Sequence, residues 1–288
     1  MRVYKYSIWW RKLLHKPIVA LVRSSLTRKV KLICNEFVPN DKPAVYAATH
    51  VFVDDVPCAI CEIEDSVFVL YGGGGSTTMP IMDRIACWLV GFIPVCRGDR
   101  ESRRQSLHTI TQILKNGGNI LIFPEGSWNM TPAMPVKKLW WGLLDAAKDA
   151  EANIVPVAVQ LVGNEYCVTI GERFEYEKFS EKSDQINALR DEMATLAWEL
   201  IEMSPSLKRE DVSDNYWLAR ARNNLKRAPW VSLAEEESHS FRPKGESSLG
   251  EVLADMHGLE YKSMVADHEQ YKIVEQLIEG WTKPASFK

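Results

Sequence analysis

The sequence predicts an α/β fold in which helices flank a mostly parallel sheet. From residue 44 to about residue 203, short β-rich runs alternate with segments whose apolar residues recur at helical spacing. Glycine and proline turns separate several of these segments, and the strands stop after about residue 205. With 288 residues, 46% of them apolar and 25% charged, the chain has the composition of a globular protein and the length to bury a substantial core.

The predicted strands are short runs rich in β-branched and aromatic residues. They cover residues 44–49, 67–71, 92–96, 117–126, 153–162 and 165–176. The run "GGNILIFPEG" begins with a glycine turn and ends with a Pro-Glu-Gly turn, which fixes both of its limits. The last strand is expected at an edge of the sheet and antiparallel to its neighbour.

Helical patterns lie between most of these strands. They cover residues 79–90, 101–116, 136–150 and 181–203. In the second of these segments, Leu107, Ile110 and Ile113 fall on one helical face, and a similar stripe runs along the last segment. Strands that alternate with helices in this way favour a parallel sheet covered by helices.

The charge distribution divides the chain into three predicted parts. Residues 1–35 hold nine Lys or Arg and no acid, whereas the remainder holds 26 basic and 38 acidic residues, a net charge of −12. We expect a basic amphipathic arm over 1–35, an α/β domain over 36–205 and a helical extension of unknown role over 206–288. The extension contains a polar, charged stretch followed by a final helical pattern.

The arm mixes its cations with Trp9, Trp10 and several leucines, a composition that suits a helix lying in the headgroup zone of a membrane. The absence of acids indicates an anionic membrane surface as partner. The alternative is a helix that packs on its own domain and keeps a solvated basic face.

No stretch approaches the roughly 20 apolar residues that span a bilayer, and the arm lacks the pattern of a signal peptide. The expected location is cytoplasmic, peripheral on the inner face of the membrane.

The six cysteines show no paired pattern of the kind that disulfide scaffolds or zinc sites use. Cys58 and Cys61 form one C-x-x-C, but a zinc ribbon needs a second such pair. A redox pair is the other possibility for these two thiols. Scattered cysteines of this kind are typical of reduced core residues in a cytoplasmic protein.

Three predicted strands are followed by a charged or titratable residue at the edge where functional groups collect in α/β sheets. These residues are His50, Arg97 and Glu125. An imidazole can take a hydroxyl proton near neutral pH, and a carboxylate on its other ring nitrogen fixes the tautomer. Asp54 and Asp55 are both close enough to His50 in sequence to be that carboxylate.

The two aspartates also have a simpler interpretation as helix caps. Pro57 suits the first turn of a helix, which places Asp55 or Val56 at the cap. Other catalytic motifs are missing, because G-x-S-x-G and H-E-x-x-H do not occur. The glycine-rich "YGGGGST" lacks the lysine of a phosphate-binding loop and predicts a flexible strand-to-helix connection. No metal, bound cofactor or nucleic-acid partner is expected.

Four blocks, taken in order, resemble the glycerolipid acyltransferase family, which includes the 1-acylglycerol-3-phosphate acyltransferases. They are His50 with Asp55, "GFIPVCR" ending at Arg97, "FPEGS" at 123–127 and "IVPVAV" at 154–159. The resemblance covers roughly residues 40–165, and "FPEG" is its most specific piece. It implies that His50 is the general base, that Asp55 rather than Asp54 orients it, and that an acceptor hydroxyl attacks an acyl thioester without an acyl-enzyme.

The resemblance also implies an acceptor site. Its residues are expected to be Arg97, Glu125, Gly126 and Ser127. Arg97 would hold the acceptor's phosphate. The family's Thr-Arg-Ser is Ser127-Trp128-Asn129 here, and an indole cannot make the charge-assisted bonds of a guanidinium. Lys137 and Lys138 are the candidates to replace that arginine.

The expected function is therefore transfer of a fatty acyl group from acyl-CoA or an acyl carrier protein to the hydroxyl of a lysolipid acceptor. The favoured acceptor is 1-acylglycerol-3-phosphate. The alternatives are an acyltransferase with a non-phosphate acceptor, such as a glycolipid or an amine, and an inactive protein that binds lipid surfaces.

Overall fold

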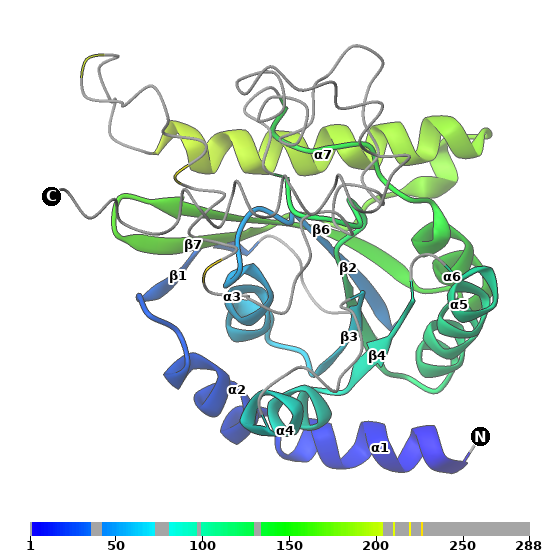
Figure 1. Ribbon diagram of the computed structural model, residues 1–288. Coiled ribbons are helices and arrows are strands. Elements are labelled where there is room, and N and C mark those ends of the chain that lie inside the picture. The colour runs from blue at the N-terminus through cyan, green and yellow to red at the C-terminus, as the bar shows by residue number, and fades with distance from the viewer. Residues whose placement is uncertain are drawn as a thin grey trace, which may run out of the picture.

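The computed structural model describes residues 2–35, 42–72, 81–96, 99–129 and 134–203, together with the isolated residues 210, 219 and 226. Its centre is a seven-stranded sheet with the strand order β1-β7-β6-β2-β5-β3-β4 (Figure 1). The strands are β1 Val30–Asn35, β2 Ala44–Ala48, β3 Val67–Tyr71, β4 Phe92–Pro94, β5 Asn119–Ile122, β6 Asn153–Val162 and β7 Glu165–Ile170. All neighbouring pairs are parallel except β6 with β7, so the predicted α/β class with a mostly parallel sheet is confirmed.

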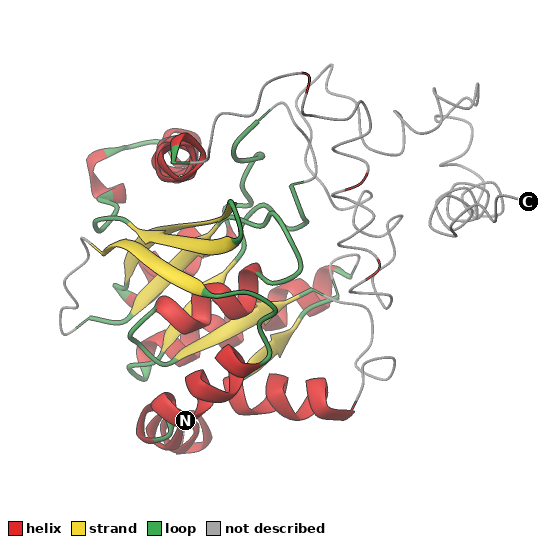
Figure 2. Cartoon of the chain, turned by 90° about the vertical axis from the view of Figure 1, so that its left-hand side faces the viewer, coloured by secondary structure: helices red, strands yellow, loops and turns green. Residues whose placement is uncertain are grey.

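The helices cover both faces of the sheet (Figure 2). They are α1 Arg2–Leu13, α2 His15–Ser24, α3 Asp55–Glu62, α4 Ile81–Val90, α5 Arg100–Lys115, α6 Gly142–Ala150 and α7 Lys182–Glu202, with a short 3₁₀ helix at Tyr176–Lys178. Successive side chains of β2 point to opposite faces of the sheet and belong to two different core clusters. Val45 and Ala47 join the cluster that packs under α5, α6 and α7, whereas Tyr46 joins the cluster under α3. The result is a three-layer arrangement of helices, sheet and helices.

Strand β7 corrects one expectation. It is antiparallel to β6, as predicted, but it does not form an edge, because β1 pairs with its other side from Val30 to Asn35. The strand β1 belongs to the cationic segment that the sequence predicts as an arm. Lys31 on this strand is exposed while Leu32 and Ile33 are half-buried, so the strand has no clear apolar alternation. Residues 30–35 are therefore structurally a part of the sheet.

The two helices that precede β1 pack on the domain with one face. Ile8 is buried in the cluster under α5, and the Arg11 side chain is buried between the rings of Trp10 and Phe68, where its guanidinium donates to the carbonyls of Leu89 and Trp88. Burial lowers the pKa of Arg11 to about 10. The contacts of this face therefore agree with the alternative interpretation, in which the segment packs on its own domain.

The other face remains exposed. Trp9, Leu13 and Leu14 on and after α1 are exposed, as is Leu21 on α2. Of the helices that the structure describes, none is both long enough and apolar enough to cross a membrane. Apart from the isolated residues 210, 219 and 226, the predicted helical extension at 206–288 lies outside the described ranges. The glycine-rich connection around residues 73–78 also lies outside them.

Candidate functional site

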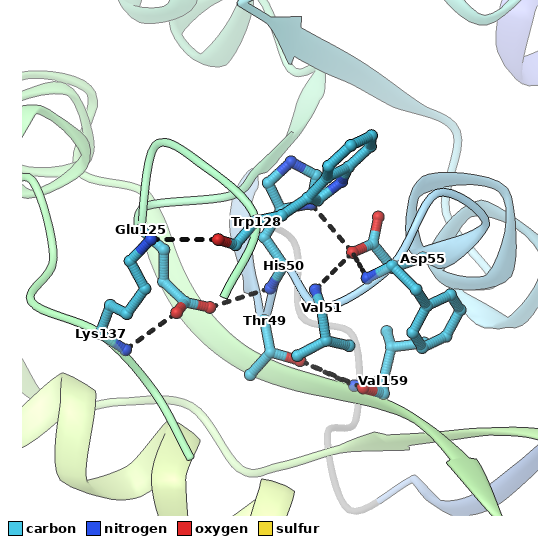
Figure 3. Close-up of polar contacts among 9 residues, drawn as sticks. Thr49, His50, Val51, Asp55, Glu125, Trp128, Lys137 and Val159 are labelled. Atoms are coloured by element: carbon cyan, nitrogen blue, oxygen red, sulfur yellow. Dashed lines mark hydrogen bonds and ion pairs between the residues drawn. The ribbon is translucent and has the colours of Figure 1, made fainter. Parts of the chain in front are cut away.

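The loop after β2 brings His50 and Asp55 together (Figure 3). The Nδ1 atom of His50 lies 2.9 Å from Oδ2 of Asp55. Because an ionised carboxylate only accepts hydrogen bonds, this contact favours the tautomer in which Nδ1 carries the proton and Nε2 is free to accept one. The His50 side chain is 20% exposed whereas that of Asp55 is fully buried, so the imidazole lies between the buried carboxylate and solvent.

The turn that follows His50 holds Asp55 in place. The Oδ2 atom of Asp55 also accepts from the backbone N–H groups of Val51, at 2.7 Å, and Phe52, at 3.1 Å. Helix α3 begins at Asp55 and its N-cap position is Asp54, whose side chain makes no capping hydrogen bond. The interpretation of Asp55 or Val56 as a simple cap is therefore wrong, because the carboxylate of Asp55 faces back into the turn. Among the described residues, the buried Oδ1 of Asp55 has no hydrogen-bond partner.

Glu125 connects three segments beneath the histidine. Its Oε1 atom accepts the backbone N–H of His50 at 2.9 Å, and its Oε2 atom accepts the backbone N–H of Lys137 at 2.8 Å. The side chain is fully buried. Burial raises the pKa of Glu125, although the two backbone hydrogen bonds and the nearby Lys137 oppose this shift. The carboxylate thus fixes the backbone of His50, which is a different position from the acceptor contact that the resemblance implies.

Lys137 holds the loop after Glu125. Its Nζ atom donates to Oγ of Ser127 at 2.8 Å and to the carbonyl of Trp128 at 3.1 Å, and its side chain is almost completely buried. Ser127 is buried as well. The sequence suggested Lys137 as a substitute for a phosphate-binding arginine, but this ammonium group is occupied by the loop itself.

Aromatic rings surround the imidazole. The ring centroid of Phe123 lies 4.7 Å from that of His50, and the ring centroid of Trp128 lies 6.0 Å from it. Both rings are tilted relative to the imidazole. Trp128 occupies the position of the motif arginine that the resemblance leads one to expect, so the surroundings of His50 on this side are aromatic. Asn129 completes the loop by donating its backbone N–H to the carbonyl of His50 at 2.5 Å.

Gly126 makes the turn between Glu125 and Ser127. Its φ is +74°, and a Cβ atom at this position would lie 2.6 Å from Nε1 of Trp140, so a side chain would require both a strained backbone and a shift of the indole.

Arg97, the expected phosphate ligand, lies outside the described residues. It follows β4, which is separated from β2 by β3 and β5 in the sheet. Within the described ranges, no group of His, Cys, Asp and Glu side chains is arranged to hold a metal ion.

The mostly parallel sheet thus presents, at its strand ends, an imidazole that a carboxylate orients and that can accept a proton. Residues 29–160 match the family model described as Acyltransferase. This match confirms the resemblance carried by the four sequence blocks.

One curated protein and one solved structure are similar to parts of this chain. A 1-acyl-sn-glycerol-3-phosphate acyltransferase of Chlamydomonas reinhardtii is 29% identical over 140 residues, which are 47% of this chain and 40% of that protein. This chain thus matches less than half of the length of that relative. The crystal structure of the 1-acyl-sn-glycerophosphate acyltransferase PlsC of Thermotoga maritima superposes with a TM-score of 0.52 at 19% identity, over 69% of this chain and 83% of that one. This second similarity is one of fold.

Two features of the site are not predictable from the motif residues alone. The first is the structural use of Lys137, which lies 12 residues beyond Glu125 and is brought back by the loop. Its only signal in the sequence is a pair of lysines before an apolar run. The second is Tyr166 on β7, which contacts Asp54 and Phe52 and has no motif around it.

Proposed function

We propose that this protein transfers a fatty acyl group from an acyl thioester, acyl-CoA or an acyl carrier protein, to the hydroxyl of 1-acylglycerol-3-phosphate. The observation that carries the proposal is the contact between His50 Nδ1 and Asp55 Oδ2, which leaves the other ring nitrogen available to a hydroxyl. The acyltransferase match over residues 29–160 supports the class of reaction. The similarity to a 1-acyl-sn-glycerol-3-phosphate acyltransferase of Chlamydomonas reinhardtii supports the acceptor.

The chemistry follows from this pair. Nε2 of His50 takes the proton of the acceptor hydroxyl as its oxygen attacks the thioester carbonyl, and Asp55 stabilises the imidazolium that forms. When the tetrahedral intermediate collapses, the carbon–sulfur bond breaks and the imidazolium returns the proton to the departing thiolate. The products are an ester and a free thiol, and His50 is regenerated. No acyl-enzyme is needed, so the site requires a base and an anion clamp rather than a nucleophile.

The acceptor site is proposed to lie between the loop 123–129 and the end of β4. Arg97 is proposed to hold the phosphate, with Gly126 and the neighbouring backbone shaping the site. Glu125 and Ser127 are proposed to act by holding this loop, because both are buried and hydrogen-bonded, Glu125 to the backbone of His50 and Ser127 to Lys137.

A second candidate is an acyltransferase with an uncharged or zwitterionic acceptor. The observation that favours it is the indole of Trp128, which lies beside His50. A guanidinium at this position would add a charge-assisted bond to a phosphate, and the indole cannot. The two candidates share the base and differ only in the head group.

The protein is proposed to work on the cytoplasmic surface of the membrane, where it would be held peripherally by α1, α2 and α4. Trp9 on α1 is 62% exposed and Trp88 on α4 is 65% exposed, and the two helices are in contact through Arg11. Exposed indoles next to cations suit the headgroup zone.

The test is an incubation of the purified protein with radiolabelled acyl-CoA or acyl carrier protein and a panel of acceptors. The panel contains lysophosphatidate, lysophosphatidylcholine, monoacylglycerol and a fatty amine. A preference for lysophosphatidate supports the first proposal, and a preference for an uncharged or zwitterionic acceptor supports the second. Absence of transfer with every acceptor and both donors would contradict both and favour a lipid-binding protein without activity.

A further inference from the structure

Tyr166 contacts two residues of the turn that carries the base. It is buried on β7, on the face of the sheet that α3 covers. Its hydroxyl donates a hydrogen bond to Oδ2 of Asp54. Its ring stacks on that of Phe52, with centroids 5.1 Å apart and planes inclined by 13°. One side chain on a distant strand therefore holds both Phe52 and Asp54, which lie between His50 and Asp55.

These two contacts bear directly on the carboxylate. The backbone N–H of Phe52 is one of the two turn donors to Oδ2 of Asp55, and Asp54 is the residue immediately before it. The backbone N–H of Asp55 in turn donates to the carbonyl of Phe52 at 3.2 Å. A displacement of Phe52 or Asp54 would therefore move the same oxygen that accepts from His50 Nδ1.

We propose that Tyr166 is a positioning residue for the His50–Asp55 pair, acting through Asp54 and Phe52. The inference rests on the proposed function, because it assumes that the pair is the catalytic base and its orienting carboxylate. Glu125 already fixes the backbone of His50 from one side of the loop. Tyr166 holds the turn through Asp54 and Phe52, so the geometry of the pair depends on the loop after β5 and on β7 as well as on the turn itself.

Tyr166 also links this turn to the segment that precedes the sheet. Oγ of Thr27, between α2 and β1, lies 3.3 Å from the hydroxyl of Tyr166 and 3.5 Å from Oδ2 of Asp54. The three side chains form one polar cluster beside an otherwise apolar face of the sheet. Thr27 adds the weaker contacts, so the test concentrates on Tyr166.

The test compares Tyr166→Phe with Tyr176→Phe in the full chain. Each variant removes the hydroxyl of a buried tyrosine, but that of Tyr176 donates to the carbonyl of Ala152, at 3.5 Å and just before β6, and not to the turn at 50–55. We expect Tyr166→Phe to lower kcat about tenfold with little change in KM for either substrate, because a small misplacement of catalytic groups is costly. Tyr176→Phe should leave both constants close to those of the wild type.

A double-mutant cycle separates positioning from general stability. Once Asp55→Asn has removed the oriented carboxylate, Tyr166→Phe should lower kcat no further. An equal loss in both backgrounds would overturn the proposal, because it would show that Tyr166 acts independently of Asp55. If Tyr166→Phe fails to fold, Phe52→Leu takes its place in the cycle, since it removes the stacked ring and keeps the backbone N–H.

A second readout does not depend on transfer activity. The imidazole ¹⁵N spectrum of His50, assigned by comparison with His50→Ala, reports which ring nitrogen carries the proton. We expect the Nδ1-protonated form in the wild type and a mixture of tautomers in Tyr166→Phe. An unchanged spectrum would overturn the positioning role even in an active enzyme, whereas a changed spectrum in a protein without transfer activity would contradict the proposed function alone.

Discussion

The backbone N–H of His50 donates to Oε1 of Glu125 at 2.9 Å, although the two residues are 75 positions apart in the chain. The other carboxylate oxygen accepts the backbone N–H of Lys137 at 2.8 Å. One buried side chain therefore joins the ends of β2 and β5 to the loop that leads into α6. The backbone position of His50 depends on this carboxylate, which is fully buried.

Replacing Glu125 with Gln should destabilise the protein. An amide has one acceptor oxygen, so its NH₂ group would face one of the two backbone N–H donors. We expect the free energy of unfolding to fall by about 1–3 kcal/mol, the usual cost of a buried polar group left unpaired. Urea unfolding measures it, and Glu199→Gln on the exposed side of α7 is the matched control. A variant as stable as the wild type would contradict this role for the carboxylate.

The free energy of unfolding of the wild type should also depend on pH differently from that of Glu125→Gln. Burial raises the pKa of Glu125. The Glu125 carboxyl is therefore still protonated in the folded protein at pH values at which it is already ionised in the unfolded chain. The contribution of this titration to the free energy of unfolding is fully present below the ordinary pKa of a glutamate and is lost as the pH rises through the raised value. The stability of the wild type relative to Glu125→Gln should therefore decline across that window. A constant difference would contradict the raised pKa.

The alternation of elements was predictable from the sequence because apolar spacing is a local signal. Residue 44 begins β2 and residues 67–71 are β3, as predicted. Strand β1 was not predictable, since its pairing with β7 is a tertiary contact and its one lysine, Lys31, continues the run of cations in the helices before it. The same limit applies to the site. The spacing of His50 and Asp55 is visible in the chain, whereas the burial of Glu125 depends on a loop that closes over it.

The pair of aspartates gives a direct test of the proposed base. His50→Ala should lower kcat by about 10²–10⁴, the usual contribution of general-base catalysis. Asp55→Asn should be comparably severe, because an amide favours the wrong tautomer. Asp54→Asn should cost much less, since its side chain still offers an oxygen to Tyr166. Circular dichroism checks that all three variants fold. An inactive Asp54→Asn beside an active Asp55→Asn would show that the assignment of the pair is wrong.

Trp128 should determine how strongly the site discriminates between head groups. In Trp128→Arg, a guanidinium near His50 adds a charge-assisted bond to a phosphate, which is worth about 1.5–3 kcal/mol. We expect the ratio of kcat/KM for lysophosphatidate to that for monoacylglycerol to rise about tenfold. Taking the ratio cancels any general loss of activity, and Trp128→Phe is the control that keeps an aromatic wall. An unchanged ratio would place the phosphate away from this residue.

The two thiols of the C-x-x-C should be unreactive in the folded protein. Cys58 and Cys61 are buried on α3, and burial raises the pKa of both, that of Cys61 to about 11. The thiolate is the reactive form, so a thiol reagent at pH 7.5 should modify exposed Cys96 first. Cys58 and Cys61 should react only after unfolding, which peptide mass spectrometry can follow. Rapid modification of either in the folded protein would reopen the redox interpretation.

The exposed indoles of Trp9 on α1 and Trp88 on α4 are the side chains that we expect to contact the membrane. Removal of the whole segment is a poor test, because it would also remove buried Ile8 and Arg11. Three cations are also engaged with the domain: Arg11, Lys12 through the carbonyl of Gly117, and Arg23 through Glu62. Point variants avoid this difficulty. Trp9→Ser and Trp88→Ser change side chains that are mostly exposed, and Trp198→Ser on α7, 54% exposed, is the matched control.

Each indole should add on the order of 1–2 kcal/mol to membrane binding if it inserts into the headgroup zone. The double variant Trp9→Ser with Trp88→Ser should therefore bind vesicles of phosphatidylglycerol and phosphatidylcholine at least about tenfold more weakly. Its activity should fall on acceptor embedded in vesicles and remain on a short-chain, monomeric acceptor. Raising the salt concentration should weaken binding of the wild type without abolishing it, because screening acts on the cations and not on apolar insertion. If Trp198→Ser has the same effect, or if the double variant still binds as the wild type does, the membrane contact lies on another surface.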